Sequence, residues 1–298
     1  MQNQFFRRGA AMVVTLALAV SAALPGFAVC AMPIQTASAD EAVYLFDVST
    51  GEAVLDQNAD QQRSIASLTK MMTALLFLES GKDMNEKVTV PASLKSELDT
   101  IRSKGGSSIS LSVGESIRRI DLLYALLVCS ANDAASVIAC DVAGSMSAFV
   151  ARMNARAAEL GCTGTQFSCP HGLYDEGNYS TAHDLARIAA ACAGHLTYLK
   201  VADTVEYVIP ATNLHAKRTI RTTNKMLVPT YSYYRTDIHG MKTGFTSKAR
   251  RCYVTFSQRE GAAYGLVILG SDLENIYKEA NEIFDWAYTE YPAQAKAG

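Results

Sequence analysis

The chain has 298 residues, of which 49% are hydrophobic and 19% are charged, and its formal net charge is -2. This length is enough for one large domain or two small ones with a substantial core. The near-neutral charge and the lack of any stripe of lysine and arginine in the sequence exclude nucleic acid as an expected partner.

The N-terminal segment 1–39 has the features of a secretory signal peptide. Arg7-Arg8 precedes an apolar run over residues 10–24, and Ala37-Ser38-Ala39 fits the small-residue rule for cleavage. An uncleaved membrane anchor is the alternative, although the run is short for a spanning helix. We therefore expect an exported, extracytoplasmic protein at the cell wall or membrane surface. Its mature part would be residues 40–298, with membrane association only through the N-terminal segment.

Strand patterns begin the remaining sequence, and helical patterns follow them. Residues 41–58 alternate around a Ser-Thr-Gly turn and predict a β-hairpin. A helix is expected next, with Ser67 in its first turn and Gly81 as its stop signal. The segment 88–114 is polar and rich in turn residues, and it carries only weak strand signals.

Three further helical segments are predicted before strand character returns. Residues 116–144 contain two helical runs interrupted at Ser130-Ala131-Asn132. Ser147 is expected to cap a helix that ends at Gly161, and Ser180-Thr181 begins another helix. Strands are then predicted in 206–210, 252–258 and 263–270, and an amphipathic helix in 273–291. This order predicts an antiparallel sheet made from both chain ends, with a helical insertion as a second lobe.

Six of the seven cysteines follow the signal segment, and outside the cell an even number permits disulfides. Cys162 and Cys169, which flank a short loop, are the best candidates for a bridge. Cys140 and Cys192 lie in Ala-rich helical runs and are expected to be small buried apolar residues. The cysteine spacing fits no zinc template, so we expect no metal and no cofactor.

Three polar motifs interrupt apolar or turn sequence, each occurring once and in this order: Ser67-x-x-Lys70, Ser130-x-Asn132 and Lys242-Thr243-Gly244. Residues three apart in a helix share a face, so Ser67 and Lys70 are expected to be neighbours. Taken singly, the motifs also fit a helix cap, a helix break and a solvated turn. Together they are typical of serine β-lactamases and penicillin-binding proteins, although the middle motif there has Asp in second place.

The sequence around these motifs extends the match, with the ordered blocks IASLTKMMTALLFLE, SANDAASVIA, MNARAAELG, PHGL, YSTAHDLARIA, TNKML and GMKTGFTSKA. Over roughly residues 40–291, the chain resembles the low-molecular-weight penicillin-binding proteins of the D-alanyl-D-alanine carboxypeptidase family, serine peptidase family S11. The resemblance implies an α/β (α+β) fold of the serine β-lactamase/transpeptidase type. In that fold an antiparallel sheet from both chain ends is flanked by helices and carries an inserted helical lobe. We expect no C-terminal β domain or membrane helix within residues 40–298.

Acyl transfer requires a nucleophile, a base and donors for the oxyanion, and the motifs can supply them. Ser67 is the expected nucleophile, attacking the carbonyl of the penultimate D-Ala of a peptidoglycan stem peptide. Lys70 would take its proton, which requires a partly neutral amine, favoured by burial and by the nearby cation Lys242. Ser130 would relay that proton to the leaving amine.

The other motif residues are expected to hold the substrate. Asn132 would hold either Lys70 or the amide of the substrate. Lys242 and Thr243 would bind its terminal carboxylate, and Gly244 would let it lie close to the strand edge.

The resemblance also implies an oxyanion hole formed by the backbone N–H groups of Ser67 and Phe245. Water would then hydrolyse the acyl-enzyme, and β-lactam antibiotics would acylate the same serine. The five histidines include no partner pattern for a Ser-His-Asp triad, so we expect no catalytic role for them.

Two other functions are considered. A serine β-lactamase shares the fold and motifs, but its commonest class needs Glu in an E-x-x-x-N loop, whereas Asp175-Glu176 is followed by Asn178. The other alternative is not an enzyme: it is a catalytically silent protein that binds peptidoglycan. The family usually has Ala-Gly after the Lys-Thr-Gly motif, whereas here Ala249 is followed by Arg250 and Arg251, whose bulk is expected to alter the local strand geometry. One of these arginines could replace an Arg that some members place near the carboxylate. Cys169 stands where Asn is more usual.

Overall fold

The computed structural model describes residues 39–174, 176–272 and 276–291. The predicted signal peptide therefore lies outside the described residues, apart from Ala39. Residues 273–275 and 292–298, at the two ends of the predicted C-terminal helix, also lie outside them.

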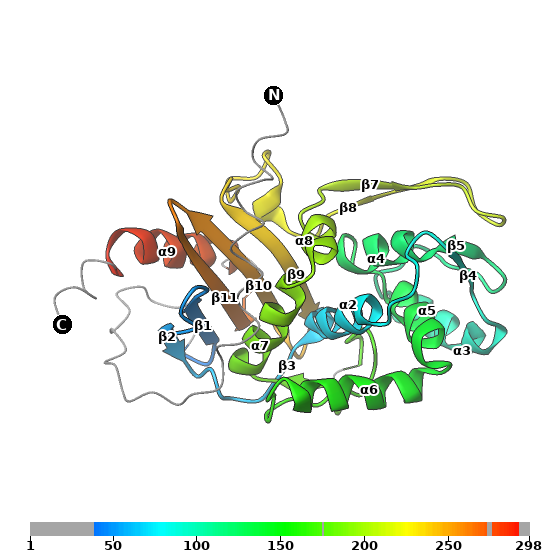
Figure 1. Ribbon diagram of the computed structural model, residues 1–298, viewed down its shortest axis with the longest axis horizontal. Helices are drawn as coiled ribbons and strands as arrows, with labels where there is room; N and C mark the ends of the chain where they lie inside the picture. Colours follow the sequence, from blue (N-terminus) through cyan, green and yellow to red (C-terminus); the bar gives the residue numbers. More distant parts are fainter. Residues whose placement is uncertain (1–38, 175, 273–275, 292–298) are drawn as a thin grey trace.

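A five-stranded antiparallel sheet joins the two ends of the chain, as predicted. Its strand order is β2-β1-β11-β10-β9, so the first hairpin adds to the edge of the last three strands. The strands are β1 (Ala42–Asp47), β2 (Ala53–Gln57), β9 (Ile238–Thr246), β10 (Arg250–Arg259) and β11 (Ala262–Ser271). Because β9 is at the edge, its outer side is free to face the helical lobe (Figure 1).

Alternating side chains on the strands separate two hydrophobic cores. In β1, Val43 and Leu45 belong to the core under α9 (Ile276–Thr289), whereas Ala42 and Phe46 belong to the core of the helical lobe. This is the period-two pattern of a strand buried on both faces. Figure 1 accordingly shows α9 on one side of the sheet and the other helices on the opposite side.

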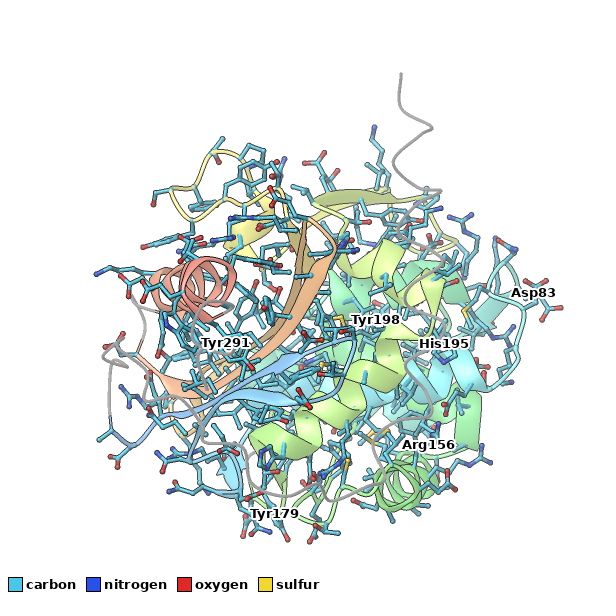
Figure 2. All side chains as sticks on the ribbon, turned by 60° about the vertical axis from the view of Figure 1, so that its left-hand side comes forward. Asp83, Arg156, Tyr179, His195, Tyr198 and Tyr291 are labelled. Atoms are coloured by element: carbon cyan, nitrogen blue, oxygen red, sulfur yellow. The ribbon has the colours of Figure 1, made fainter. Side chains whose placement is uncertain are left out.

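The helical lobe is inserted between β2 and β9, as expected. Its central helix, α2 (Thr69–Glu79), is buried nearly all round, and the other helices pack about it. They are α3 (Lys95–Ser103), α4 (Arg119–Leu127), α5 (Asn132–Ala143), α6 (Met146–Glu159), α7 (Ala182–Ala193) and α8 (Leu196–Ala202). Figure 2 shows Tyr198 of α8 in the interior between the sheet and the helices. Its hydroxyl donates to the carbonyl of Met241 in β9, at 3.3 Å, which ties the lobe to the strand beside Lys242.

Short elements connect these layers. Single turns of 3-10 helix occur at η2 (Ala66–Leu68), η3 (Ala92–Leu94) and η4 (Lys225–Leu227). Three pairs of short strands are β3 (Arg63–Ser64) with β6 (Tyr179–Ser180), β4 (Lys87–Thr89) with β5 (Ser116–Arg118), and β7 (Glu206–Ile209) with β8 (Arg218–Arg221).

Several local predictions need correction. The segment 88–114 contains the helix α3, which was missed because only Leu98 and Ile101 on it are buried, too few for a helical pattern. The cap of α6 is Ser145, whose Oγ accepts from the Ala148 N–H at 3.2 Å, and not Ser147. Thr181 caps α7 as expected, accepting from the Asp184 N–H at 3.1 Å.

The predicted Cys162–Cys169 disulfide is absent, because all six cysteines of the described chain are free thiols. Cys192 is fully buried, as expected, whereas Cys140 is only partly buried.

Within the described ranges, no helix on its own is long and apolar enough to cross a membrane. Only α5 and α6 counted together, with a bend of 84° at their junction, have the required length and composition.

Candidate active site

The three motifs meet in one cleft of about 720 Å³ between the edge strand β9 and the helical lobe. Ser67 lies at its floor on η2, and Ser130 and Asn132 lie at the break between α4 and α5. The described residues lining the cleft also include Lys104, Gly105, Gly106, Ser107, Gly172, Leu173, Thr223, Thr243, Gly244, Phe245, Thr246, Ser247, Lys248 and Arg251. Lysine and arginine side chains are therefore present at this cleft, and no Asp or Glu is among its described lining residues.

Ser67 occupies a 3-10 turn directly before α2, and not the first turn of the α-helix as predicted. The turn is unusual because Ala66 has a φ of +47°, a conformation that costs an L-residue about 1–2 kcal/mol. Gly172, with φ +75°, allows this close packing: a Cβ there would lie 1.8 Å from the Ala66 carbonyl oxygen. The strained turn is thus held by its neighbours, an arrangement that is common at active sites.

Lys70 is fully buried one turn after Ser67, and its Nζ contacts three oxygen atoms. These are Ser67 Oγ at 2.9 Å, Asn132 Oδ1 at 2.7 Å and the His171 carbonyl oxygen at 2.6 Å. Burial, and then the charge of Lys242, hold the pKa of Lys70 well below its ordinary value. Both effects favour the neutral form of the amine that touches the serine hydroxyl.

Ser130 and Asn132 are placed by a sharp break in the helical chain. Ser130 has a φ of +62°, and the Asn132 N–H then donates to the Ser107 carbonyl at 2.8 Å. Both side chains are buried, Asn132 against Gly106, where a Cβ would come within 2.7 Å of Asn132 Nδ2. The predicted interruption between two helices is confirmed, and it turns both polar side chains toward the cleft.

Lys242, Thr243 and Gly244 lie within β9, a strand that was not expected from the sequence. Lys242 is buried, which lowers its pKa to about 7, and its Nζ donates to the Thr243 carbonyl at 2.7 Å. The Thr243 hydroxyl lies 2.5 Å from the hydroxyl of Thr223 at the cleft wall. A Cβ on Gly244 would lie 3.0 Å from the Ile65 carbonyl oxygen and 3.1 Å from the Ser67 nitrogen. The glycine therefore brings β9 against the turn that carries Ser67.

Phe245, the other residue of the expected oxyanion hole, follows Gly244 at the rim, with 49% of its surface exposed. Arg251 lies opposite Phe245 in the β9–β10 ladder, and its guanidinium carbon is 5.4 Å from the centre of the Phe245 ring. The ladder continues through this position, and only the pairing of β10 with β11 shifts register between Arg251 and Cys252. The two arginines are thus accommodated: Arg250 takes a φ of +57° and Arg251 lines the cleft.

Of the two arginines considered for the carboxylate, Arg251 is among the described residues that line the cleft, and its buried Nε has no hydrogen-bond partner among the described residues. One feature of the site was not expected from the sequence, namely the part played by His171: its side chain is fully buried and its carbonyl accepts from Lys70. The sequence block PHGL contains His171 and is the signal that points to this loop. The hydrogen bond between the His171 carbonyl and Lys70 joins positions 101 residues apart, so no local pattern reveals it.

Glu176 is exposed, as expected for a solvated loop charge, whereas Asp175 lies outside the described residues. Asn178 donates to Thr69 Oγ1 at 2.8 Å and so belongs to the support of α2. Within the described ranges, no group of three or more His, Cys, Asp or Glu side chains is placed to hold a metal ion.

Comparisons with known proteins agree with this geometry. A family model described as D-alanyl-D-alanine carboxypeptidase, Peptidase_S11, matches residues 29–272. The chain is 31% identical over 253 residues to the D-alanyl-D-alanine carboxypeptidase DacF of Bacillus subtilis, covering 83% of this chain but 61% of DacF. It is also 31% identical to a D-alanyl-D-alanine endopeptidase of Pseudomonas aeruginosa, covering 95% of this chain and 89% of that protein.

Among solved structures, the chain is similar to the Streptomyces K15 DD-transpeptidase, with a TM-score of 0.78 and 28% identity. The match covers 87% of this chain and 99% of that protein. The expected architecture of a penicillin-recognising enzyme is therefore confirmed by an independent comparison of folds.

Proposed function

The chain belongs to the D-alanyl-D-alanine carboxypeptidase family, peptidase S11, and from this premise we propose that it removes the terminal D-Ala from peptidoglycan stem peptides. It would do so as a serine hydrolase, through an acyl-enzyme on Ser67. The observation that carries the proposal is the contact of 2.9 Å between Ser67 Oγ and the buried Lys70 Nζ. A pKa below the ordinary value makes Lys70 a competent base. Its position lets it take the proton of the Ser67 hydroxyl.

The first half of the reaction forms the acyl-enzyme. Ser67 Oγ bonds to the carbonyl carbon of the penultimate D-Ala while its proton passes to Lys70. The peptide C–N bond then breaks, and Ser130 relays a proton to the leaving nitrogen, so that free D-Ala departs. The backbone N–H groups of Ser67 and Phe245 would stabilise the oxyanion, a contribution worth about 3–4 kcal/mol for one such donor in other enzymes.

The second half returns the enzyme to its starting state. A water molecule attacks the ester carbon, Lys70 accepts its proton, and Ser67 Oγ leaves with a proton. A β-lactam would enter the same route through its ring carbonyl, and its acyl-enzyme would persist if water reaches the ester slowly.

Recognition of the peptide terminus rests on cations and hydroxyls on the β9 side. Thr243 and Thr223 form a polar wall of the cleft, and the buried Lys242 donates to the Thr243 carbonyl. Arg251 adds a guanidinium whose Nε has no partner among the described residues. A carboxylate is the chemical group that such a wall would bind best. Asn132, which holds Lys70 through Oδ1, would keep its amide nitrogen for the substrate backbone.

The place of action follows from the substrate. Peptidoglycan is assembled outside the cytoplasm, and the signal pattern in residues 1–39 supports export to that space. We place the enzyme at the periplasmic or outer face of the cell membrane, with any attachment through the N-terminal segment.

A peptide ending in D-Ala-D-Ala tests the proposal, with released D-Ala and the shortened peptide as the measured products. We expect one D-Ala per cleaved peptide, and none from the Ser67→Ala variant. Rapid penicillin hydrolysis without peptide cleavage would instead identify a β-lactamase. Binding of peptidoglycan without any cleavage or acylation would identify a silent binder.

Cleavage within cross-linked peptides is the second candidate activity. The Pseudomonas aeruginosa relative, 89% of whose length matches this chain, is a D-alanyl-D-alanine endopeptidase. The same serine and base would serve both reactions, and they differ only in the group attached to the leaving amine. Digestion of cross-linked muropeptides, followed by chromatography, distinguishes the two.

A further inference from the structure

We propose that Glu97, on α3, is a positioning residue that holds the general base Lys70 in place through His171. The inference rests on the proposed function, in which Lys70 removes the proton of Ser67. Glu97 does not touch the reacting atoms, and it lies on the helix that the sequence did not predict.

The loop carrying His171 docks on α2 through two consecutive carbonyl groups. The Pro170 carbonyl accepts from Thr73 Oγ1 at 2.6 Å, and the His171 carbonyl accepts from Lys70 Nζ at 2.6 Å. Thr73 and Lys70 are neighbours on one face of the helix. A shift of this loop would therefore change the surroundings of Lys70 directly.

The His171 carbonyl determines where the lone pair of a neutral Lys70 points. A neutral amine has two N–H donors and one lone pair. Asn132 Oδ1 and the His171 carbonyl can only accept hydrogen bonds, and they would take both donors. The lone pair is then left facing Ser67 Oγ, at 2.9 Å, as a base requires. Loss of the His171 acceptor would free the amine to rotate.

The side chain of His171 fixes its own carbonyl, and Glu97 is its outer partner. The imidazole is fully buried, its Nδ1 accepts from the Leu173 N–H at 3.0 Å, and its Nε2 lies 2.9 Å from Glu97 Oε1. Because an N–H already points at Nδ1, the ring proton is on Nε2 and is donated to Glu97. Without that carboxylate, the buried Nε2–H of His171 would lose its hydrogen-bond partner. A shift of the loop that exposes this N–H to water would then become favourable.

Glu97 is suited to this role because it stays ionised. Burial raises its pKa, but the hydrogen bond with His171, together with the other donors, outweighs burial and leaves the pKa below its ordinary value. The Tyr174 hydroxyl also donates to Glu97, at 3.3 Å from Oε2, and Lys104 lies 4.3 Å from the centre of the Tyr174 ring. The carboxylate thus has donors on two sides and a cation nearby.

The other titratable groups near His171 lie on its own loop and on α2. Burial lowers the pKa of His171, yet hydrogen bonds with Cys169 and Glu97 outweigh it and raise the pKa, while the charge of Lys70 opposes them. Burial raises the pKa of Cys169, but His171 and nearby backbone N–H groups bring it down to about 7. On the far side, Gly172 packs closely on Ala66, and a Cβ at Gly172 would lie 1.8 Å from the Ala66 carbonyl oxygen.

Glu97→Ala and Glu97→Gln test the proposal, with Asp99→Asn as the matched control. Asp99 is a carboxylate on the same helix, but it is exposed and pairs with Lys95 and Arg102. The measurements are the rate constant of acylation by benzylpenicillin across pH, kcat and KM for a D-Ala-D-Ala peptide, and the melting temperature.

We expect Glu97→Ala to lower the acylation rate constant about 10- to 100-fold with little change in KM, since small displacements of a catalytic group cost this much. The Glu97→Gln amide oxygen can still accept from His171, so this variant should keep most of the parental rate. The acid limb of the acylation rate in Glu97→Ala should move to lower pH, because the Lys70 ammonium loses an acceptor. Lys242, Cys169, Cys129 and Asp133, which also act on Lys70, are unchanged in every variant.

Parental acylation in Glu97→Ala would overturn the inference. So would an equal loss in Glu97→Ala and Glu97→Gln that follows a fall in melting temperature and leaves the acid limb in place, since that result describes a purely structural role. If the parent protein itself fails to acylate, the proposed function has failed instead, and the two failures are therefore distinguishable.

Discussion

Lys70 and Lys242 are both buried, and the pKa of Lys70 is lowered first by its burial and then by the charge of Lys242. They come from different lobes, Lys70 from α2 and Lys242 from β9. Two buried cations that repel each other are unfavourable for folding, but the repulsion favours the neutral amine that a base requires. The pair therefore connects the packing of the two lobes to the chemistry proposed for Ser67.

Lys242→Gln should shift the acid limb of the pH profile of the acylation rate to higher pH. Removing the cation lets the pKa of Lys70 rise toward its ordinary value, so a higher pH is needed to free its lone pair. Lys242→Arg is the control, because it retains the charge and should not shift the acid limb of the pH–rate profile to higher pH. The rate of β-lactam acylation measured across pH checks both variants, and an unmoved limb in Lys242→Gln would refute the electrostatic role.

Lys242→Met should make the protein more stable at neutral pH while lowering its activity. The folded-state pKa of Lys242 is about 7, well below the value of roughly 10.4 for an unfolded lysine. Between these values the unfolded chain binds more protons, so this lysine makes stability rise with pH by up to about 1.4 kcal/mol per pH unit.

The Lys242→Met variant should lack this rise of stability with pH. Its gain in melting temperature over the parent should be largest at or below pH 7 and shrink by pH 9. Thermal unfolding at both pH values measures the difference, and a gain independent of pH would contradict this account.

Gly244→Ala should slow acylation about 10- to 100-fold, because the new Cβ would press on Ile65 and on the backbone nitrogen of Ser67. Gly194→Ala is a suitable control, since Gly194 has a helical φ of -62° and lies at the end of α7. Acylation kinetics and melting temperatures should be compared for the two variants. Equal behaviour of the two would show that β9 need not approach Ser67 so closely.

Arg251→Ala should weaken the reaction of substrates that carry a free terminal carboxylate. A hydrogen bond to a charged group is worth roughly 1.5–3 kcal/mol, which corresponds to about a 10- to 100-fold loss in kcat/KM. A peptide with an amidated terminus should lose much less. Arg250→Asn serves as the control, because Asn tolerates the left-handed backbone at that position and Arg250 is exposed. Equal losses for acid and amide substrates would assign Arg251 a structural role only.

The motif residues and four of the five strands of the described sheet could be predicted from the sequence because their signals are local, whereas the edge strand β9 was not expected. Strand alternation gave the hairpin at residues 41–58 and the last two strands, and the three motifs meet in the cleft as the resemblance implied. Where Ser67 sits could not be predicted, since the 3-10 turn depends on Gly172 and Gly244 packing against it from distant segments.

The support around the base was also beyond sequence reasoning. Lys70 bonds to Asn132 and to His171 across 62 and 101 residues of chain, respectively. The helix α3, which supplies Glu97, shows too little apolar periodicity to be recognised before its packing is known. Local patterns thus pointed to the proposed reacting groups, whereas the contacts that tune them arise only in the folded chain.

The most direct test of the central claim is the mass of the intact protein after mixing with excess benzylpenicillin, followed by peptide mapping of the adduct. The account predicts a gain of one penicilloyl group, located on Ser67, and no gain in Ser67→Ala. An adduct on another residue, or an unchanged protein that neither binds nor hydrolyses penicillin, would contradict it.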